Sequence, residues 1–349
     1  MFTHKIRASA RNRSGYARLI AVVALIFCGA TLACSSTRSS TAAAAPPSIA
    51  PGQPAPPASQ TGGFNGSRAW SYLVKIVSFG PRPPASANIH REQRYLASEL
   101  HSFGCQVTQD HFQAETQLGT LGMDNIIAKI PGRSPGIVLF LSHYDTLRLP
   151  GFVGADDGGS STALLLEMAH DLCGRPSPMT VWIAFLDGEE DQENFATAEQ
   201  AQTTWSNSNA LFGSRELAAS MDLSGDLKRV KAVLLADMIG DDHLDVTRDS
   251  NSTPWLENMV WSVAKRLGEG QYFLNSSMSI VDDHTPFIER GVPSADIIDF
   301  DYRYWHTAQD TLNHCSPHSI AVVGYVLLET LHELDQKFAP AAQPAKRPG

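Results

Sequence analysis

The sequence lacks a basic excess, internal repeats and a long apolar run. The net charge is −9, with 36 acidic against 27 basic residues, whereas phosphate binding needs a basic face. Nucleic acid is therefore not expected as a partner. The N-terminal apolar stretch, residues 19–33, has fifteen residues, fewer than the about 20 of a membrane-spanning helix.

Cysteine is scarce as well. Beyond the N-terminal region only Cys105, Cys173 and Cys315 remain, so at most one disulfide can form. No two of them stand at the spacing of metal ligands, which leaves a metal site to His and carboxylate side chains. Cys173 ends an apolar helical pattern, and we interpret it as a small buried apolar residue. A cysteine nucleophile is not expected.

The first 34 residues are predicted to be an export signal. A basic region precedes the apolar stretch, which ends in small residues. Thr31-Leu-Ala-Cys34 resembles a bacterial lipoprotein cleavage box, in which Cys34 would carry the lipid and tether the protein to a membrane. Simple cleavage and an uncleaved anchor are the alternatives. We expect an exported protein, either periplasmic or attached to the cell envelope.

Composition divides the rest of the chain. Residues 35–64 are rich in Ser, Thr, Ala and Pro and are predicted to form a disordered linker. The chain is 43% hydrophobic and 18% charged, which suffices for one large core. We place this catalytic domain at residues 65–338. Residues 339–349 are predicted to be a disordered tail.

Strand and helix patterns alternate along the domain. Strands are predicted at residues 106–113, 125–130, 137–141, 180–186, 230–236 and 294–299. Helices are predicted at residues 69–77, 89–103, 160–172, 210–220, 254–267 and 318–337. The alternation indicates an α/β fold of three layers, α/β/α, around a mixed, mostly parallel sheet.

Two adjacent carboxylates follow one of these strands. The apolar run Thr180-Val-Trp-Ile-Ala-Phe-Leu186 ends in Asp187-Gly-Glu-Glu190. Neighbouring residues that leave a strand point in different directions, so one carboxylate can bind a metal while the other moves protons. Taken alone, the pair is typical of solvated surface. Its meaning depends on what the other strand ends carry.

Other strand ends carry ionisable residues too. One apolar run leads into His143 and another into Asp237, while Asp157 lies in a glycine-rich turn before a helix. Because ligands collect at the carboxyl ends of strands in an open α/β sheet, these residues are expected to converge. The set predicts a zinc site, with candidate ligands His143, Asp157, Glu190, Asp237 and His306. A buried core histidine at position 143, and helix caps or loop acids at positions 157 and 237, are the alternatives.

The ordered motifs resemble those of glutaminyl-peptide cyclotransferases, within the zinc aminopeptidase-like superfamily. They span about residues 66–337 and are Ser142-His-Tyr-Asp145, Gly154-Ala-Asp-Asp157, Phe185-Leu-Asp-Gly-Glu-Glu190, Leu211-Phe-Gly-Ser-Arg-Glu-Leu-Ala218, Leu235-Ala-Asp-Met-Ile-Gly240, Asp282-Asp-His-Thr-Pro-Phe287, Arg290-Gly-Val-Pro293 and Trp305-His-Thr307. The resemblance implies an enzyme that converts the N-terminal glutamine of peptides or proteins to pyroglutamate and releases ammonia. We expect it to act as a monomer.

Three features favour a cyclase over an aminopeptidase. Asp282 stands where aminopeptidases typically have Ser in a similar motif. Trp305 directly precedes His306, and Trp205 precedes Gly-Ser-Arg, as in the cyclases, in which an indole walls a small pocket. Core packing is the alternative for each tryptophan.

The resemblance also implies a role for each site residue. One Zn²⁺ per chain would be held by Asp157, Glu190 and His306 and would polarise the γ-carbonyl of the substrate glutamine. Glu189 would carry the proton from the substrate amine to the departing ammonia. The amine and the leaving nitrogen would be held by Asp237 and Asp282. Trp205 and Trp305 would line the substrate pocket.

An aminopeptidase would use nearly the same residues. In that alternative two co-catalytic Zn²⁺ ions are present, His143 and Asp237 bind the second ion, and Asp157 bridges the two. Glu189 would then activate a water molecule. A third hypothesis is a cell-surface binding domain without catalysis.

The sequence departs from the animal cyclases in several places. Residues 191–204 make the segment after the Glu pair longer than expected. Ser142 and Thr162 stand where the animal enzymes have their disulfide cysteines, so that bridge is absent. Gly158 replaces a Ser, and Asp296 replaces a His of the proton network. The outer hydrogen-bond network is therefore expected to differ.

Overall fold

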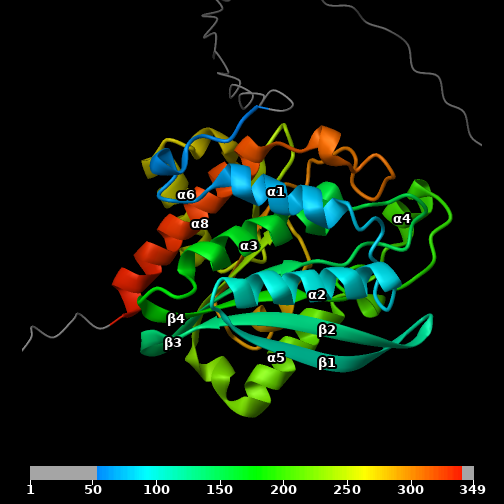
Figure 1. Ribbon diagram of the computed structural model, residues 1–349, viewed down its shortest axis with the longest axis horizontal. Coiled ribbons are helices and arrows are strands. Elements are labelled where there is room, and N and C mark those ends of the chain that lie inside the picture. The colour runs from blue at the N-terminus through cyan, green and yellow to red at the C-terminus, as the bar shows by residue number, and fades with distance from the viewer. Residues whose placement is uncertain (1–52, 340–349) are drawn as a thin grey trace, which may run out of the picture. The chain divides into compact units, whose positions relative to one another are not determined.

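The computed structural model describes residues 53–339, which contain one mixed sheet between two layers of helices (Figure 1). Its strands are β1 (Gln106–Thr116), β2 (Gly119–Ile130), β3 (Gly132–His143), β4 (Ser177–Leu186), β5 (Val230–Asp237), β6 (Val246–Asp249), β7 (Phe273–Met278) and β8 (Ser294–Ile298). Its helices are α1 (Gly66–Val77), α2 (Ala87–Ser102), α3 (Ser161–Leu172), α4 (Ala198–Thr204), α5 (Phe212–Ser224), α6 (Pro254–Leu267), α7 (Thr285–Ile288) and α8 (Pro317–Phe338).

The sheet is parallel at its centre, and the strand pair on either side joins this centre antiparallel, while the edge strand β7 pairs parallel with β6. Its strand order is β1-β2-β4-β3-β5-β8-β6-β7. The four central strands β4, β3, β5 and β8 run parallel, whereas β2 pairs antiparallel with β4 and β6 pairs antiparallel with β8. The carboxyl ends of the central strands therefore meet at one edge. This arrangement confirms the predicted mixed, mostly parallel sheet.

Alternating apolar residues make both faces of the sheet a core. In β3, Val138 and Phe140 join the larger apolar cluster, while Leu139 and Leu141 join a second cluster on the opposite face. This is the two-residue period of a strand that is buried on both sides. Helices α1, α3, α6 and α8 lie on one face and α5 on the other (Figure 1). The three-layer α/β/α prediction is confirmed.

Four elements were not predicted. They are α4, α7, β6 and β7, and two of them have only four residues each. The edge strand β7 exposes most of its side chains, so its sequence carries no continuous apolar run. Helix α4 lies in residues 191–204, which we had described only as a long segment. Short or exposed elements take their structure from tertiary contacts rather than from a periodic pattern.

The predicted linker begins to fold before residue 65. Phe64 is fully buried and Ala55 packs on the main core. The Gln53 amide also lies 3.1 Å from the His318 imidazole on α8. The boundary at residue 65 is therefore wrong for residues 53–64, which pack on the domain. The predicted export signal, Cys34, the rest of the linker and residues 340–349 lie outside the described residues. Within residues 53–339 no helix is both long and apolar enough to cross a membrane.

A disulfide joins Cys105 to Cys173, the one bridge that the cysteine count allows. Cys173 is buried, as predicted, but it is bridged rather than only a small apolar residue. The two Cα atoms are 5.1 Å apart, since Cys105 follows α2 and Cys173 ends α3, and these helices pack together. Cys315 is free and buried.

Replacing both bridged cysteines by serine is expected to lower the free energy of unfolding by about 2–4 kcal/mol, because the bridge closes a long loop of the unfolded chain. The two cysteines are 68 residues apart in sequence. Urea unfolding of the Cys105→Ser/Cys173→Ser variant, beside the oxidised and the reduced parent protein, measures this. Equal stability of all three would contradict the expectation.

Candidate active site

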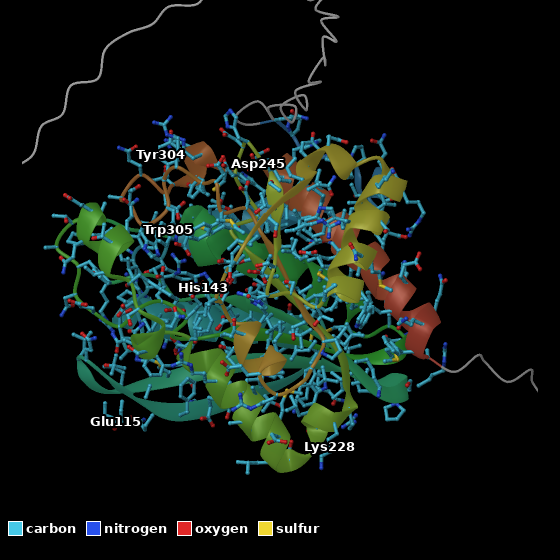
Figure 2. All side chains as sticks on the ribbon, turned by 180° about the vertical axis from the view of Figure 1, so that it is seen from behind. Glu115, His143, Lys228, Asp245, Tyr304 and Trp305 are labelled. Atoms are coloured by element: carbon cyan, nitrogen blue, oxygen red, sulfur yellow. A yellow bond between two sulfur atoms is a disulfide. The ribbon has the colours of Figure 1, made fainter. Side chains whose placement is uncertain are left out.

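The carboxyl edge of the sheet gathers the predicted residues. His143 is the last residue of β3 and Asp237 the last of β5, while the Glu pair follows β4. Asp157 lies in the turn Ala155–Ser160 that leads into α3. His143 lies deep inside the ribbon, whereas Glu115 and Lys228 lie at the periphery (Figure 2). The predicted site residues therefore lie at one edge of the sheet, as the strand ends predict.

Two triads of ligand atoms share Asp157. In the first, His143 Nε2 lies 3.2 Å from Asp157 Oδ1 and 3.1 Å from Asp237 Oδ1. In the second, His306 Nε2 lies 3.2 Å from Glu190 Oε2 and 3.6 Å from Asp157 Oδ2. Within each triad one ligand atom per residue lies within 4.8 Å of the others, and all five residues are buried.

The second triad fits a divalent zinc ion. Asp157 Oδ2 and Glu190 Oε2 are buried and have no hydrogen-bond partner. Burial and the negative charge of Asp157 raise the pKa of Glu190 to about 7. Buried carboxylates around one point need a compensating charge, and two carboxylates with one imidazole form a typical donor set for Zn²⁺.

Asp145 positions the Glu pair, a role that we did not assign from the sequence. Its two carboxylate oxygens accept hydrogen bonds from the backbone N–H groups of Glu189 and Glu190, at 3.1 and 3.4 Å. Asp145 Oδ1 also lies 3.6 Å from His143 Nδ1. The sequence contained a signal for the contact with His143, because His143 and Asp145 are two residues apart, and such residues point to the same side of an extended segment. Asp145 thus orients one imidazole and both peptide groups of the pair.

Glu189 is a buried carboxyl group beside His143. Burial raises its pKa well above the ordinary value of 4.5, and the charge of Asp282 adds to this, while nearby His143 opposes it. Glu189 Oε2 lies 3.9 Å from His143 Nδ1. A carboxyl group with a raised pKa can both take and return a proton near neutral pH. The geometry thus separates Glu189 from its neighbour Glu190, which faces His306.

A cavity of about 240 Å³ opens beside Glu189. Seven of the nine predicted site residues line it: Asp157, Glu189, Trp205, Asp237, Asp282, Trp305 and His306. The Trp305 indole stacks on the His306 imidazole with ring centroids 3.9 Å apart, and the Phe300 ring lies 5.1 Å from the indole. The rest of the wall is apolar and was not predicted from the sequence; it includes Met278, Ile280, Val281, Ile298 and Phe300. Apolar residues at these positions look like ordinary core in a sequence.

Asp282 also lines this cavity and is 4% exposed. Burial and the charge of Asp237 raise the pKa of Asp282 to about 7. Crowded carboxylates share protons, so a proton is held in this group of acids near neutral pH. A protonated carboxyl can donate a hydrogen bond, and an ionised one can accept one.

The backbone is strained at two site residues. Met238 has φ 44° and His306 has φ 54°, in the left-handed region that side chains disfavour. Gly158 is required by its surroundings: at φ 77° its added Cβ would lie 2.8 Å from His143 Cε1. The expected difference from the animal cyclases at this position thus has a steric reason here.

Asp310 ties the His306 loop to the turn that carries Asp157. Its carboxylate oxygens accept hydrogen bonds from the backbone N–H groups of Asp156 and Asp157, at 2.8 and 3.1 Å. Asp156 in turn accepts a 2.7 Å hydrogen bond from the Gly240 N–H, beyond the end of β5. These buried acids connect three ligand-bearing loops. We did not assign them a role from the sequence.

The outer network contains a second buried His and acid group. His284 Nε2 lies 3.0 Å from Asp249 Oδ2, and its Nδ1 lies 3.9 Å from Asp296 Oδ2. Where the animal enzymes have disulfide cysteines, the hydroxyl groups of Ser142 and Thr162 lie 3.2 Å apart. A hydrogen bond thus occupies the place of that bridge.

Comparisons with known proteins agree with this geometry. The model of peptidase family M28 matches residues 125–331. A glutaminyl-peptide cyclotransferase-like protein of Mus musculus is 29% identical, covering 78% of this chain and 76% of its own length. A solved glutaminyl cyclase of an Acidobacteriales bacterium is 38% identical with a TM-score of 0.72, covering 78% of this chain and 96% of that chain. A solved Zn-dependent exopeptidase of Parabacteroides distasonis is 30% identical with a TM-score of 0.69, covering 77% of this chain and 98% of that chain.

Proposed function

Because the chain belongs to peptidase family M28, and a solved glutaminyl cyclase shares its fold at 38% identity, we propose that it is a glutaminyl-peptide cyclotransferase. Its substrates would be peptides or proteins with an N-terminal glutamine, and its products pyroglutamate and ammonia. The observation that carries this proposal is the position of Asp282 beside Glu189 and Asp237 in a small, indole-walled cavity. The enzyme is proposed to act as an exported monomer.

We assign one zinc ion to Asp157, Glu190 and His306. These residues offer two carboxylates and one imidazole, the three protein ligands that a catalytic zinc site uses. When bound, zinc supplies Lewis-acid polarisation of the γ-carbonyl of the substrate glutamine. The backbone N–H groups of Asp157 and Glu190 donate hydrogen bonds to Asp310 and Asp145, which position the backbone of these two proposed ligands.

Glu189 then moves the proton. Its carboxylate accepts a proton from the α-amine of the substrate, which attacks the γ-carbonyl carbon and closes the ring. The same carboxyl returns a proton to the departing nitrogen, which leaves as ammonia. Asp237 and Asp282 line the same cavity and would hold the two nitrogen atoms through hydrogen bonds. The shared proton in this group lets one acid donate while another accepts.

The indole walls would orient the substrate. Ring closure is intramolecular, so a cavity that holds the glutamine side chain curled towards its own amine contributes much of the rate. Trp305 is fixed against His306 and Phe300, and Trp205 lines the same cavity.

Both triads place an imidazole beside carboxyl groups. Burial lowers the pKa of His143, but the charge of Asp237 and hydrogen bonds with Asp145, Asp157 and Asp237 raise it well above 6.5. Burial also lowers the pKa of His306, but the charge of Glu190 and a hydrogen bond with it outweigh burial and raise the pKa. Zinc binding at either triad would therefore displace a proton from the imidazole.

The second candidate is a two-zinc aminopeptidase. It is favoured by the triad of His143, Asp157 and Asp237, whose ligand atoms, like those of Asp157, Glu190 and His306, all lie within 4.8 Å of one another. In that enzyme Glu189 would activate water instead of the substrate amine.

Ammonia release from a short Gln-terminated peptide, measured beside cleavage of Leu- and Ala-terminated peptides, tests the proposal. The cyclase releases ammonia and leaves the other peptides intact. Metal analysis of the same sample should find one zinc per chain. Two tightly held zinc ions together with cleavage of the Leu-terminated peptide would establish the aminopeptidase.

Removing zinc is expected to destabilise the protein more at higher pH. The raised pKa of Glu190, about 7 against an ordinary 4.5, means that the metal-free native state holds a proton that the unfolded state has lost. Stability of the metal-free protein therefore falls as pH rises from about 4.5 to about 7. Zinc keeps Glu190 ionised and removes this dependence. Thermal unfolding with and without chelator should show a larger Tm difference at about pH 7.5 than at about pH 5, and an equal difference would contradict the account.

A further inference from the structure

The segment that follows the Glu pair reaches back to the metal triad. The Gln202 side-chain amide, on α4, donates a 2.7 Å hydrogen bond to the carbonyl oxygen of Trp305. That carbonyl belongs to the peptide group between Trp305 and His306. One exposed side chain from residues 191–204 thus contacts the backbone between the pocket wall and a zinc ligand.

The peptide group between Trp305 and His306 adjoins a strained backbone angle, so its orientation needs a stabilising contact. His306 has φ 54°, in the left-handed region that is strained for a residue with a side chain. The angle φ of His306 describes rotation about the bond next to this peptide plane, so fixing the Trp305 carbonyl limits that rotation. The same plane sets the direction of the Trp305 indole, which stacks on the imidazole.

Helix α4 is itself anchored, so Gln202 is presented from a fixed element. Asp191 accepts hydrogen bonds from the Ser206 N–H and from the Asn209 side-chain amide, and thereby closes the segment at its base. Phe195 and Ala201 are buried in a small apolar cluster with Phe152. The Phe152 ring meets the His306 imidazole edge-on, with centroids 6.1 Å apart.

We propose that Gln202 is a positioning residue, which orients the Trp305–His306 peptide and thereby both the zinc ligand His306 and the pocket wall Trp305. This inference rests on the proposed function for its kinetic consequences, but not for its effect on zinc retention. A lost donor lets the peptide rotate, which loosens zinc and widens the pocket. Both effects come from one hydrogen bond on a side chain that touches neither substrate nor metal.

The test compares three variants of the full chain. Gln202→Met keeps the length of the side chain and removes the donor, whereas Gln202→Lys keeps a donor. Thr203→Ala is the matched control, because the Thr203 hydroxyl bonds only to carbonyl groups of its own helix in the described residues. The readouts are kcat and KM on a Gln-terminated peptide, and the rate at which a chelator removes zinc.

Gln202→Met is expected to release zinc about 3- to 10-fold faster and to raise KM by a similar factor, from the typical net strength of one hydrogen bond. Gln202→Lys should return to within about 2-fold of the parent protein, and Thr203→Ala should match it. Equal zinc release and kinetics in all three variants would overturn the proposal. If the parent protein releases no ammonia, the proposed function fails, and the zinc-release comparison still decides the role of Gln202.

Discussion

Replacing Glu189 by glutamine is expected to lower kcat by about 10²- to 10⁴-fold, the usual contribution of a positioned proton-transfer group. Glutamine keeps the size of the side chain but cannot accept the proton of the substrate amine. Zinc content should stay the same, because the proposed ligand is the neighbouring Glu190, which faces His306. Steady-state ammonia release and metal analysis on the same sample measure both quantities.

Glu115→Gln is a suitable control for this variant. Glu115 is an exposed residue on β1, at the periphery of the domain (Figure 2). The control should keep full activity. If Glu189→Gln also kept full turnover, the proton would have to move through another acid of the cavity, of which Asp282, with its pKa of about 7, is the leading one.

Replacing His306 by alanine is expected to remove zinc and to lower kcat/KM by about 10²- to 10⁴-fold, since a metal ion contributes several kcal/mol to stabilising the transition state. The variant loses the only imidazole of the proposed zinc triad. It also loses the ring on which Trp305 stacks. Metal analysis should therefore find far less than one zinc per chain, and KM should rise because the pocket wall loses its support.

His332→Ala serves as the control for the loss of an imidazole. His332 lies on α8 with 60% of its side chain exposed, beside Glu329. Zinc content and activity should match those of the parent protein. If His306→Ala retained one zinc per chain with the parent's affinity, the ion would have to be held by the other triad, and the zinc assignment would be wrong.

The parallel centre of the sheet and the ionisable residues at its carboxyl edge could be predicted from the sequence. Buried strands such as β3 and β4 have continuous apolar runs, and parallel strands necessarily end together, so His143 and the Glu pair could be brought together before any coordinates were known. A continuous apolar run reveals such a strand, because a strand that is buried on both faces has no polar positions.

The parts that could not be predicted depend on contacts between distant segments. Asp310 acts through the backbone of Asp156 and Asp157, about 150 residues earlier in the chain, and such side-chain to backbone contacts leave no pattern in a sequence. The pairing of Cys105 with Cys173 required the packing of α2 on α3. Helix α4 is short and largely exposed, so neither its presence nor the reach of Gln202 could be read from its composition.

The most direct measurement is mass spectrometry of the products formed from a mixture of Gln-terminated and Leu-terminated peptides with the zinc-loaded protein. We predict that the Gln-terminated peptide loses the mass of one ammonia and keeps its full length, while the Leu-terminated peptide is unchanged. Loss of one whole residue from either peptide, with no ammonia-deficient product, would contradict the assignment as a glutaminyl-peptide cyclotransferase.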